Sequence, residues 1–240
     1  MNTARSEPVE LRAGALQATY FDTPRANSIV RFVAGVTAAI ALALVVLPAH
    51  AEQPAPTEAP APAARLVAAA LERTQHTVRY DGRYLSIPYP NGDVPAEIGV
   101  CTDEIIRSYR QLGIDLQQRV HEDMRRHFDA YPSRRNWGLS RPDRNIDHRR
   151  VPNLQAYFGR HGVTLPVSAD PADYAPGHLV TWMLPGNLPH IGIVTDVIHP
   201  VSGRPMIMHN IGAGPMLEDM LFDYRITGHY RYLPEELAAQ

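Results

Sequence analysis

The sequence of 240 residues contains one cysteine and no lysine, so its 23 basic side chains are all arginine. We attribute the absence of lysine to a GC-rich genome. A single cysteine excludes a disulfide within the chain, although disulfides commonly staple small exported domains. Such a residue is an intermolecular link, a buried apolar side chain or a reactive thiol. The formal net charge of −2 gives no indication of a nucleic-acid partner or of binding to a membrane surface.

The N-terminal region has the pattern of an export signal. Residues 32–47 form an apolar run that is too short to span a membrane comfortably. Arg25 and Arg31 place positive charge before this apolar run, and Ala49-His50-Ala51 after it supplies a small-residue cleavage site. We interpret residues 1–51 as a signal-peptide region, with a retained membrane anchor as the alternative.

The composition then changes twice. Residues 52–64 alternate proline and alanine with acidic residues, a composition that predicts an extended linker. Residues 65–240 have the length of one domain with one core. We therefore expect an exported, periplasmic domain that has no membrane attachment after cleavage.

This domain begins with helical periodicity and ends with strand periodicity. Residues 80–89 are expected to be extended, and helices are predicted at 65–75, 102–112, 118–130 and 154–160. Alternation with a period of two predicts strands at 179–184, 190–196, 206–211 and 226–232. This order predicts an α+β fold in which N-terminal helices pack on a small antiparallel sheet.

Cys101 lies where a proline- and glycine-rich loop turns into the predicted helix 102–112. The positive end of the helix dipole and the unpaired backbone N–H groups there favour a thiolate. The same N–H groups can donate hydrogen bonds to an oxyanion that forms on a carbonyl under attack. This position suits a nucleophile, which needs a base and a group that orients the base.

Among the histidines, His190 is the best candidate for the base, because it opens a strand directly after a turn. His209 and Asn210 lie together near the end of the following strand, and either could orient the His190 ring. Side chains alternate between the faces of a strand, so both cannot point toward that ring. The sequence leaves this choice open.

A polar loop at 133–150 is rich in arginine. The common role of such a loop is a solvated surface with internal ion pairs. The alternative is a surface that grips carboxylates with arginine forks. We consider binding of substrate and a structural lock equally for the residues Asp147, His148, Arg149 and Arg150.

Several phrases of the sequence resemble known families. A cysteine at a helix start, a Pro-Gly-x-Leu-Val strand, His-x-Gly-Ile-Val and a downstream histidine resemble the NlpC/p60 cell-wall peptidases. The chain resembles most closely DUF1287, an uncharacterised bacterial family, over about Leu66 to Leu233. The shared phrases are Gly99–Asp103, Asn145–Leu154, Pro189–Val194, His209–Gly212 and Ile226–Arg231.

The resemblance implies a papain-like fold and hydrolysis of an amide bond in the stem peptides of peptidoglycan, without a cofactor. It implies that Cys101 is the nucleophile, His190 the base and His209 the orienting residue, with Asn210 as the alternate. Two departures concern the substrate: Val100-Cys101-Thr102 replaces Asp-Cys-Ser, and Pro176-Gly177-His178 replaces Pro-Gly-Asp.

Two other functions have some basis in the sequence. Cys101, His190, His209 and His148 have the ligand chemistry of a zinc site, although no paired zinc-binding motif is present. A non-catalytic module that binds cell-wall peptides is the second alternative.

Overall fold

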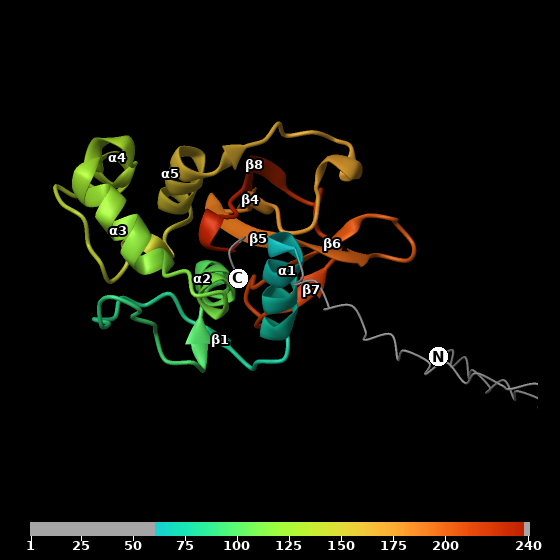
Figure 1. The fold of residues 1–240 in the computed structure, drawn as a ribbon, viewed down its shortest axis with the longest axis horizontal. Helices are drawn as coiled ribbons and strands as arrows, with labels where there is room; N and C mark the ends of the chain where they lie inside the picture. Colours follow the sequence, from blue (N-terminus) through green and yellow to red (C-terminus); the bar gives the residue numbers. More distant parts are fainter. Residues whose placement is uncertain (1–60, 238–240) are drawn as a thin grey trace, which may run out of the picture. The chain divides into compact units, whose positions relative to one another are not determined.

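The computed structural model describes residues 61–237, which fold into one α+β unit (Figure 1). The predicted signal-peptide region 1–51 and most of the predicted linker 52–64 lie outside the described residues. The helices are α1 (Pro62–Arg73), α2 (Cys101–Gln111), α3 (Leu116–Arg126), α4 (Ser133–Trp137) and α5 (Val151–His161), with 3₁₀ turns η1 (Phe128–Ala130), η2 (Asp147–Arg149), η3 (Pro171–Asp173) and η4 (Glu235–Leu237).

The main sheet has six strands in the order β3-β8-β4-β5-β6-β7, and every pairing in it is antiparallel. Its strands are β3 (Val163–Thr164), β4 (Leu179–Leu184), β5 (Leu188–Ile198), β6 (Pro205–His209), β7 (Met216–Glu218) and β8 (Arg225–Arg231). The α+β prediction with an antiparallel sheet is therefore confirmed. In Figure 1 these strands, coloured orange to red, lie together, and α1 and α2 lie against β5.

Strand alternation divides the core into two clusters on opposite faces of the sheet. Leu179, Ile191 and Ile193 face the helices and belong to the larger cluster, which also contains Ile105 and Phe158. The second cluster covers the other face with the side chains of Trp182, Val194, Ile207 and Leu221, among others. A fully buried Leu, Ile or Phe contributes roughly 1.5–3 kcal/mol, so both clusters stabilise the sheet that positions the candidate site.

A second, two-stranded sheet leads the chain into α2. Its strands β1 (Arg79–Tyr80) and β2 (Ile98–Gly99) are parallel, and Tyr80 pairs with Gly99. Helix α2 begins two residues later, and the Asp103 carboxylate accepts a hydrogen bond from the Val100 N–H at 2.7 Å. This contact satisfies a backbone donor at the helix start.

The predicted helices and long strands are present, with shifts at their ends. Helix α1 starts at Pro62, because proline is well tolerated in the first turn, where its missing N–H is not needed. The polar loop 133–150 contains α4 and η2, and most of 80–89 lies outside regular structure. Strands β3 and β7 are too short to show a period in the sequence. Within residues 61–237, no helix combines the length and hydropathy required to cross a membrane.

Candidate functional site

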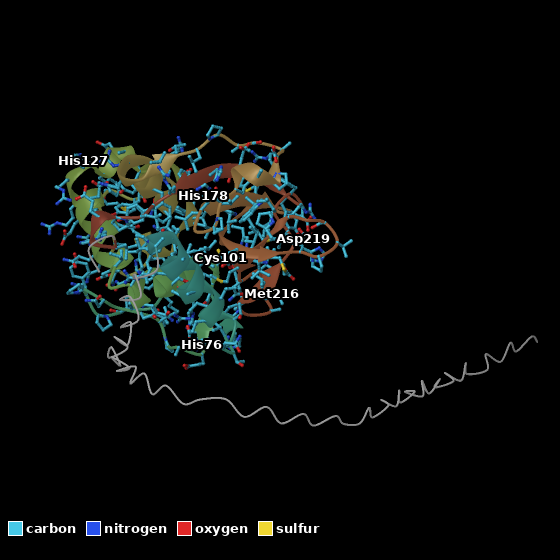
Figure 2. The ribbon with its side chains drawn as sticks, turned by 45° about the vertical axis from the view of Figure 1, so that its right-hand side comes forward. His76, Cys101, His127, His178, Met216 and Asp219 are labelled. Carbon is cyan, nitrogen blue, oxygen red and sulfur yellow. The ribbon has the colours of Figure 1, made fainter. Side chains whose placement is uncertain are left out.

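Cys101, which is labelled in Figure 2, is the first residue of α2 and is only 4% exposed. The backbone N–H groups of Ile191 and Thr102 and the Tyr80 hydroxyl lie against its sulfur. These contacts favour the thiolate, but burial outweighs them and raises the pKa of the Cys101 thiol to about 12. The expectation of a resting thiolate is therefore wrong for this conformation. The location of Cys101 at a helix start was visible in the sequence, whereas its burial was not.

His190 is the third residue of β5, and its side chain is buried. It lies opposite Trp182 in β4 and faces the second core cluster, whereas Cys101 belongs to the first cluster. The thiol meets β5 at the Ile191 amide, the residue next to His190. Backbone pairing of β5 with β6 starts only at Ile193, after His190 and Ile191. Among the described residues, no hydrogen bond joins the Cys101 thiol to the His190 ring.

His209 in β6 is the residue that contacts the His190 ring. His190 Nε2 and His209 Nδ1 are 3.0 Å apart. Gly192 makes this contact possible, because a Cβ atom there would lie 2.5 Å from Ile207 Cγ2 and 3.2 Å from His209 Cβ. Asn210 follows on the other side of the strand, and its Oδ1 accepts a hydrogen bond from the Gly212 N–H. The structure thus brings His190 and His209 together and leaves Asn210 out of the pair.

Glu218 in β7 continues this chain of hydrogen bonds and was missed in the sequence. His209 Nε2 lies 2.8 Å from Glu218 Oε2. The carboxylate accepts a hydrogen bond from the Nε2–H group of His209, so Nδ1 of a neutral His209 is an acceptor. His190 must then donate from Nε2, which leaves its Nδ1 as the free acceptor. No signal in the three residues of β7 distinguishes Glu218 from other surface acids.

The electrostatics of the pair keep both rings neutral. Burial and the neighbouring His209 lower the pKa of His190 to about 3. Burial also lowers the pKa of His209, and the Glu218 carboxylate opposes this effect. A neutral imidazole with a fixed tautomer can accept a proton, but a pKa of about 3 makes His190 a weak base in this conformation.

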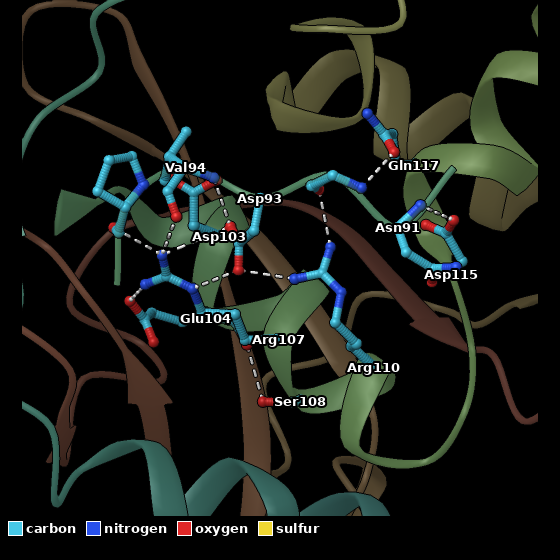
Figure 3. Close-up of polar contacts among 12 residues, drawn as sticks. Asn91, Asp93, Val94, Asp103, Glu104, Arg107, Ser108, Arg110, Asp115 and Gln117 are labelled. Atoms are coloured by element: carbon cyan, nitrogen blue, oxygen red, sulfur yellow. Dashed lines mark hydrogen bonds and ion pairs between the residues drawn. The ribbon is translucent and has the colours of Figure 1, made fainter. Parts of the chain in front are cut away.

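The start of α2 is held by buried ion pairs. Asp103 forms two hydrogen bonds with Arg149, from Nε at 2.7 Å and from Nη2 at 2.9 Å. Glu104 pairs with Arg73 at 2.9 Å, and it also contacts Arg107. Figure 3 shows Arg107 between Glu104 and a second acid, Asp93. These pairs fix the position of the residue that carries the thiol.

The predicted substrate-binding residues lie in and next to η2, and three of them are buried. Asp147 is 1%, His148 2% and Arg149 6% exposed. Arg149 is occupied by Asp103, and its carbonyl oxygen accepts a hydrogen bond from the Thr102 hydroxyl at 3.0 Å. This arrangement favours the structural lock over the substrate-gripping surface, because a buried, paired guanidinium has no donor to offer a ligand.

The remaining contacts of η2 extend this lock. Burial raises the pKa of Asp147 to about 6, and Arg150 pairs with Asp147 at 3.0 Å. The Arg150 guanidinium also stacks over Trp137, with 4.2 Å between Cζ and the ring centroid. Burial lowers the pKa of His148 to about 3, and within the described range its Nδ1 has no hydrogen-bond partner.

A zinc site has no support in this geometry. Over residues 61–237, no group of three or more histidine, cysteine, aspartate or glutamate side chains is placed to hold a metal ion. His190 and His209 bind each other, and His148 lies in the separate buried loop η2.

These features define an α+β protein in which one buried thiol lies beside strand β5, whose His190 pairs with His209 of the neighbouring strand β6. Residues 67–232 match the family described as "Domain of unknown function (DUF1287)", and the chain belongs to this family. It is also similar to "Uncharacterized protein YijF" of Escherichia coli (strain K12). The identity is 50% over 163 residues, which cover 68% of this chain and 78% of that protein.

Proposed function

We propose that this protein is an exported, thiol-dependent amide hydrolase of the NlpC/p60, papain-like type that acts on the stem peptides of peptidoglycan. The observation that carries the proposal is the hydrogen-bonded chain from Glu218 through His209 to His190. It leaves Nδ1 of His190 as a proton acceptor on the residue adjacent to Ile191, whose N–H touches the Cys101 sulfur. The substrate class and the periplasmic location rest on the sequence patterns described above.

The chemistry follows from these positions. The Cys101 sulfur attacks the amide carbonyl while its proton moves to His190 Nδ1, and backbone N–H groups at the start of α2 stabilise the oxyanion. His190 then protonates the departing amine, the C–N bond breaks, and the acyl group stays on Cys101 as a thioester. Finally, His190 takes a proton from water, the hydroxide attacks the thioester, and the carboxylic acid leaves as the thiol is restored.

This mechanism requires movement at the N-terminal end of β5. The neutral thiol and the ring of His190 lie on different sides of this strand, so substrate binding has to bring them into contact. Hydrogen bonds between catalytic groups are often long in free enzymes and tighten in the complex. Tyr80 is 43% exposed and contacts the thiol, so its ring connects the protein surface with the buried sulfur.

The decisive experiment is digestion of purified muropeptides, read by mass spectrometry. Wild type should release new products, and the Cys101→Ala and His190→Ala variants should release none. Arg225→Gln, a change at an exposed position on β8, serves as the control and should behave as wild type. Identical product patterns for wild type and Cys101→Ala would remove the hydrolase proposal. Loss of activity with a chelator but not with iodoacetamide would favour a metal enzyme.

A non-catalytic peptide-binding module is the second candidate, and the burial of the thiol favours it. A cysteine whose pKa is raised to about 12 is a weak nucleophile at neutral pH. This function predicts that Cys101→Ala binds muropeptides as tightly as wild type while neither protein cleaves them. Calorimetric binding beside the digestion assay separates the two functions.

A further inference from the structure

The arginine-rich loop that follows α4 borders a pocket of about 570 Å³, and neither the histidine pair nor the thiol lines it. The loop contributes most of its wall, and α3 and the segment after β1 contribute one residue each. The polar residues that line it are Tyr84, His121, Arg141, Asp143, Arg144 and Asn145.

Two arginines of this pocket have no acidic partner. Arg141 and Arg144 are both exposed, and no ion pair involves either guanidinium within the described part of the chain. Arg144 instead lies over the Tyr89 ring, with 5.8 Å between Cζ and the centroid. Stacking of this kind leaves the edge of the guanidinium, where the N–H groups lie, free to donate.

The acidic residue in the wall is already engaged. Asp143 Oδ2 accepts a hydrogen bond from the Tyr84 hydroxyl at 3.0 Å, and Oδ1 accepts one from the Asn145 N–H at 2.9 Å. The Asn145 amide donates to the Tyr84 hydroxyl at 2.7 Å, which satisfies that oxygen as well. Each Asp143 oxygen therefore already has one partner, whereas Arg141 and Arg144 have no ion-pair partner in the part of the chain that the structure describes.

The α3 side of the pocket contributes a histidine side chain. His121 lies in the wall, and its Nδ1 is buried without a hydrogen-bond partner among residues 61–237. Burial lowers the pKa of His121, Arg125 and Arg144 lower it further, and Asp143 and Glu122 oppose this effect. The Glu122 carboxylate accepts a hydrogen bond from the Gln118 amide at 2.8 Å.

The pocket lies close to the candidate catalytic thiol. Tyr80 touches the Cys101 sulfur, and Tyr84 lines the pocket four residues further along the same segment. Four residues span at most about 14 Å when fully extended. One extended peptide can therefore reach both places.

We propose that this pocket, through Arg141 and Arg144, binds a carboxylate of the peptide whose amide bond reaches Cys101. The forked guanidinium matches a carboxylate with two parallel hydrogen bonds, and this pocket holds two such forks without an ion pair among the described residues. The identity of the ligand rests on the proposed function, whereas the anion specificity of the pocket does not.

The test is a binding measurement on the full chain carrying Cys101→Ala, which prevents turnover. The probes are the synthetic stem peptide L-Ala-γ-D-Glu-L-Lys-D-Ala-D-Ala and the same peptide with every carboxylate converted to an amide. Titration calorimetry should show at least about tenfold tighter binding of the acid form, because charged hydrogen bonds are lost in the amide. Adding Arg141→Gln and Arg144→Gln should reduce this preference to less than about twofold. The matched control adds Arg225→Gln and Arg231→Gln, which removes equal charge from β8 and should keep the preference.

Three results would overturn the inference. The first is equal binding, or no binding, of both peptides by the parent protein. The second is a preference that survives the Arg141→Gln/Arg144→Gln change. The third is competition by inorganic phosphate at lower concentration than acetate, which would assign the pocket to phosphate. If the muropeptide digestion fails while the carboxylate preference follows the arginines, the pocket stands as a binding site and only the hydrolase proposal falls.

Discussion

The buried pair of Asp103 and Arg149 supports a sharp prediction about the loop that carries η2. Both side chains are 2% exposed, and two hydrogen bonds of 2.7 and 2.9 Å join them. Arg149→Met keeps much of the side-chain volume but leaves the Asp103 carboxylate buried without its counter-ion. Breaking a buried pair in this way costs about 3–5 kcal/mol, against a total stability of roughly 5–15 kcal/mol for a typical domain.

The assay is thermal and urea unfolding of the Arg149→Met variant. For a domain of this size, 1 kcal/mol corresponds to about 2–4 °C, so Tm should fall by roughly 6–20 °C. Arg134→Met is the control, because its partner Asp129 is exposed and exposed pairs contribute at most about 1 kcal/mol. The Asp103→Asn/Arg149→Met double variant should lose less than the sum of the single variants, since the two residues interact directly.

This measurement decides between the two roles considered for Arg149. A structural lock predicts a large loss of stability. A substrate-gripping arginine predicts weaker binding of muropeptides with little change in Tm. A loss below about 1 kcal/mol in the unfolding of Arg149→Met would refute the reasoning from burial.

Three further predictions concern the thiol, the histidine pair and its glycine. Iodoacetamide should modify native Cys101 about a thousandfold more slowly at pH 8 than a free thiol, because the thiolate fraction is about a thousandfold smaller for a pKa of about 12 than for one of 9. Equal rates of modification in the native protein and in urea would contradict this prediction. Glu218→Ala should change the ring ¹⁵N shifts of His209 and His190, because the carboxylate sets both tautomers, and it should lower muropeptide cleavage about tenfold with KM unchanged. Glu235→Ala, a change of an exposed residue in η4, is the control. Unaltered shifts in Glu218→Ala would exclude the chain of hydrogen bonds. Gly192→Ala should cost about 1–3 kcal/mol in urea unfolding, because the new methyl group would lie 2.5 Å from Ile207 Cγ2. Gly82→Ala is the control, because the nearest atom to its new methyl group, Val100 Cγ1, lies 3.5 Å away at an ordinary contact distance. Equal costs for the two variants would show that contact with Ile207 does not matter.

Much of the fold was predictable because periodicity is a local property. Helix α2 has its buried residues at helical spacing, and Asp103 closes its first turn from three residues away. Strands β4 and β5 alternate clearly enough to be assigned with their turn. The family was also predictable, since the phrases that contain Cys101 and His190 are contiguous in the sequence.

The candidate site was predictable only in part. The parity of a strand showed that His209 and Asn210 cannot both point toward His190, and the register of β5 against β6 decided for His209. Glu218 could not be found, because β7 is three residues long and its contact with His209 depends on pairing with β6. Arg141 and Arg144 looked no different from their neighbour Arg149.

The sequence by itself determined the placement of the only cysteine at a helix start and the order of helices and strands. It also limited the partners of His190 to His209 and Asn210. The tertiary structure decided how those residues behave. Burial raises the pKa of Cys101 despite the opposite effect of its helix, and the Asp103 carboxylate, 46 positions away in the sequence, pairs with Arg149 in the protein interior. Both effects arise from desolvation, which depends on what the whole fold packs around a group and not on its neighbours along the chain.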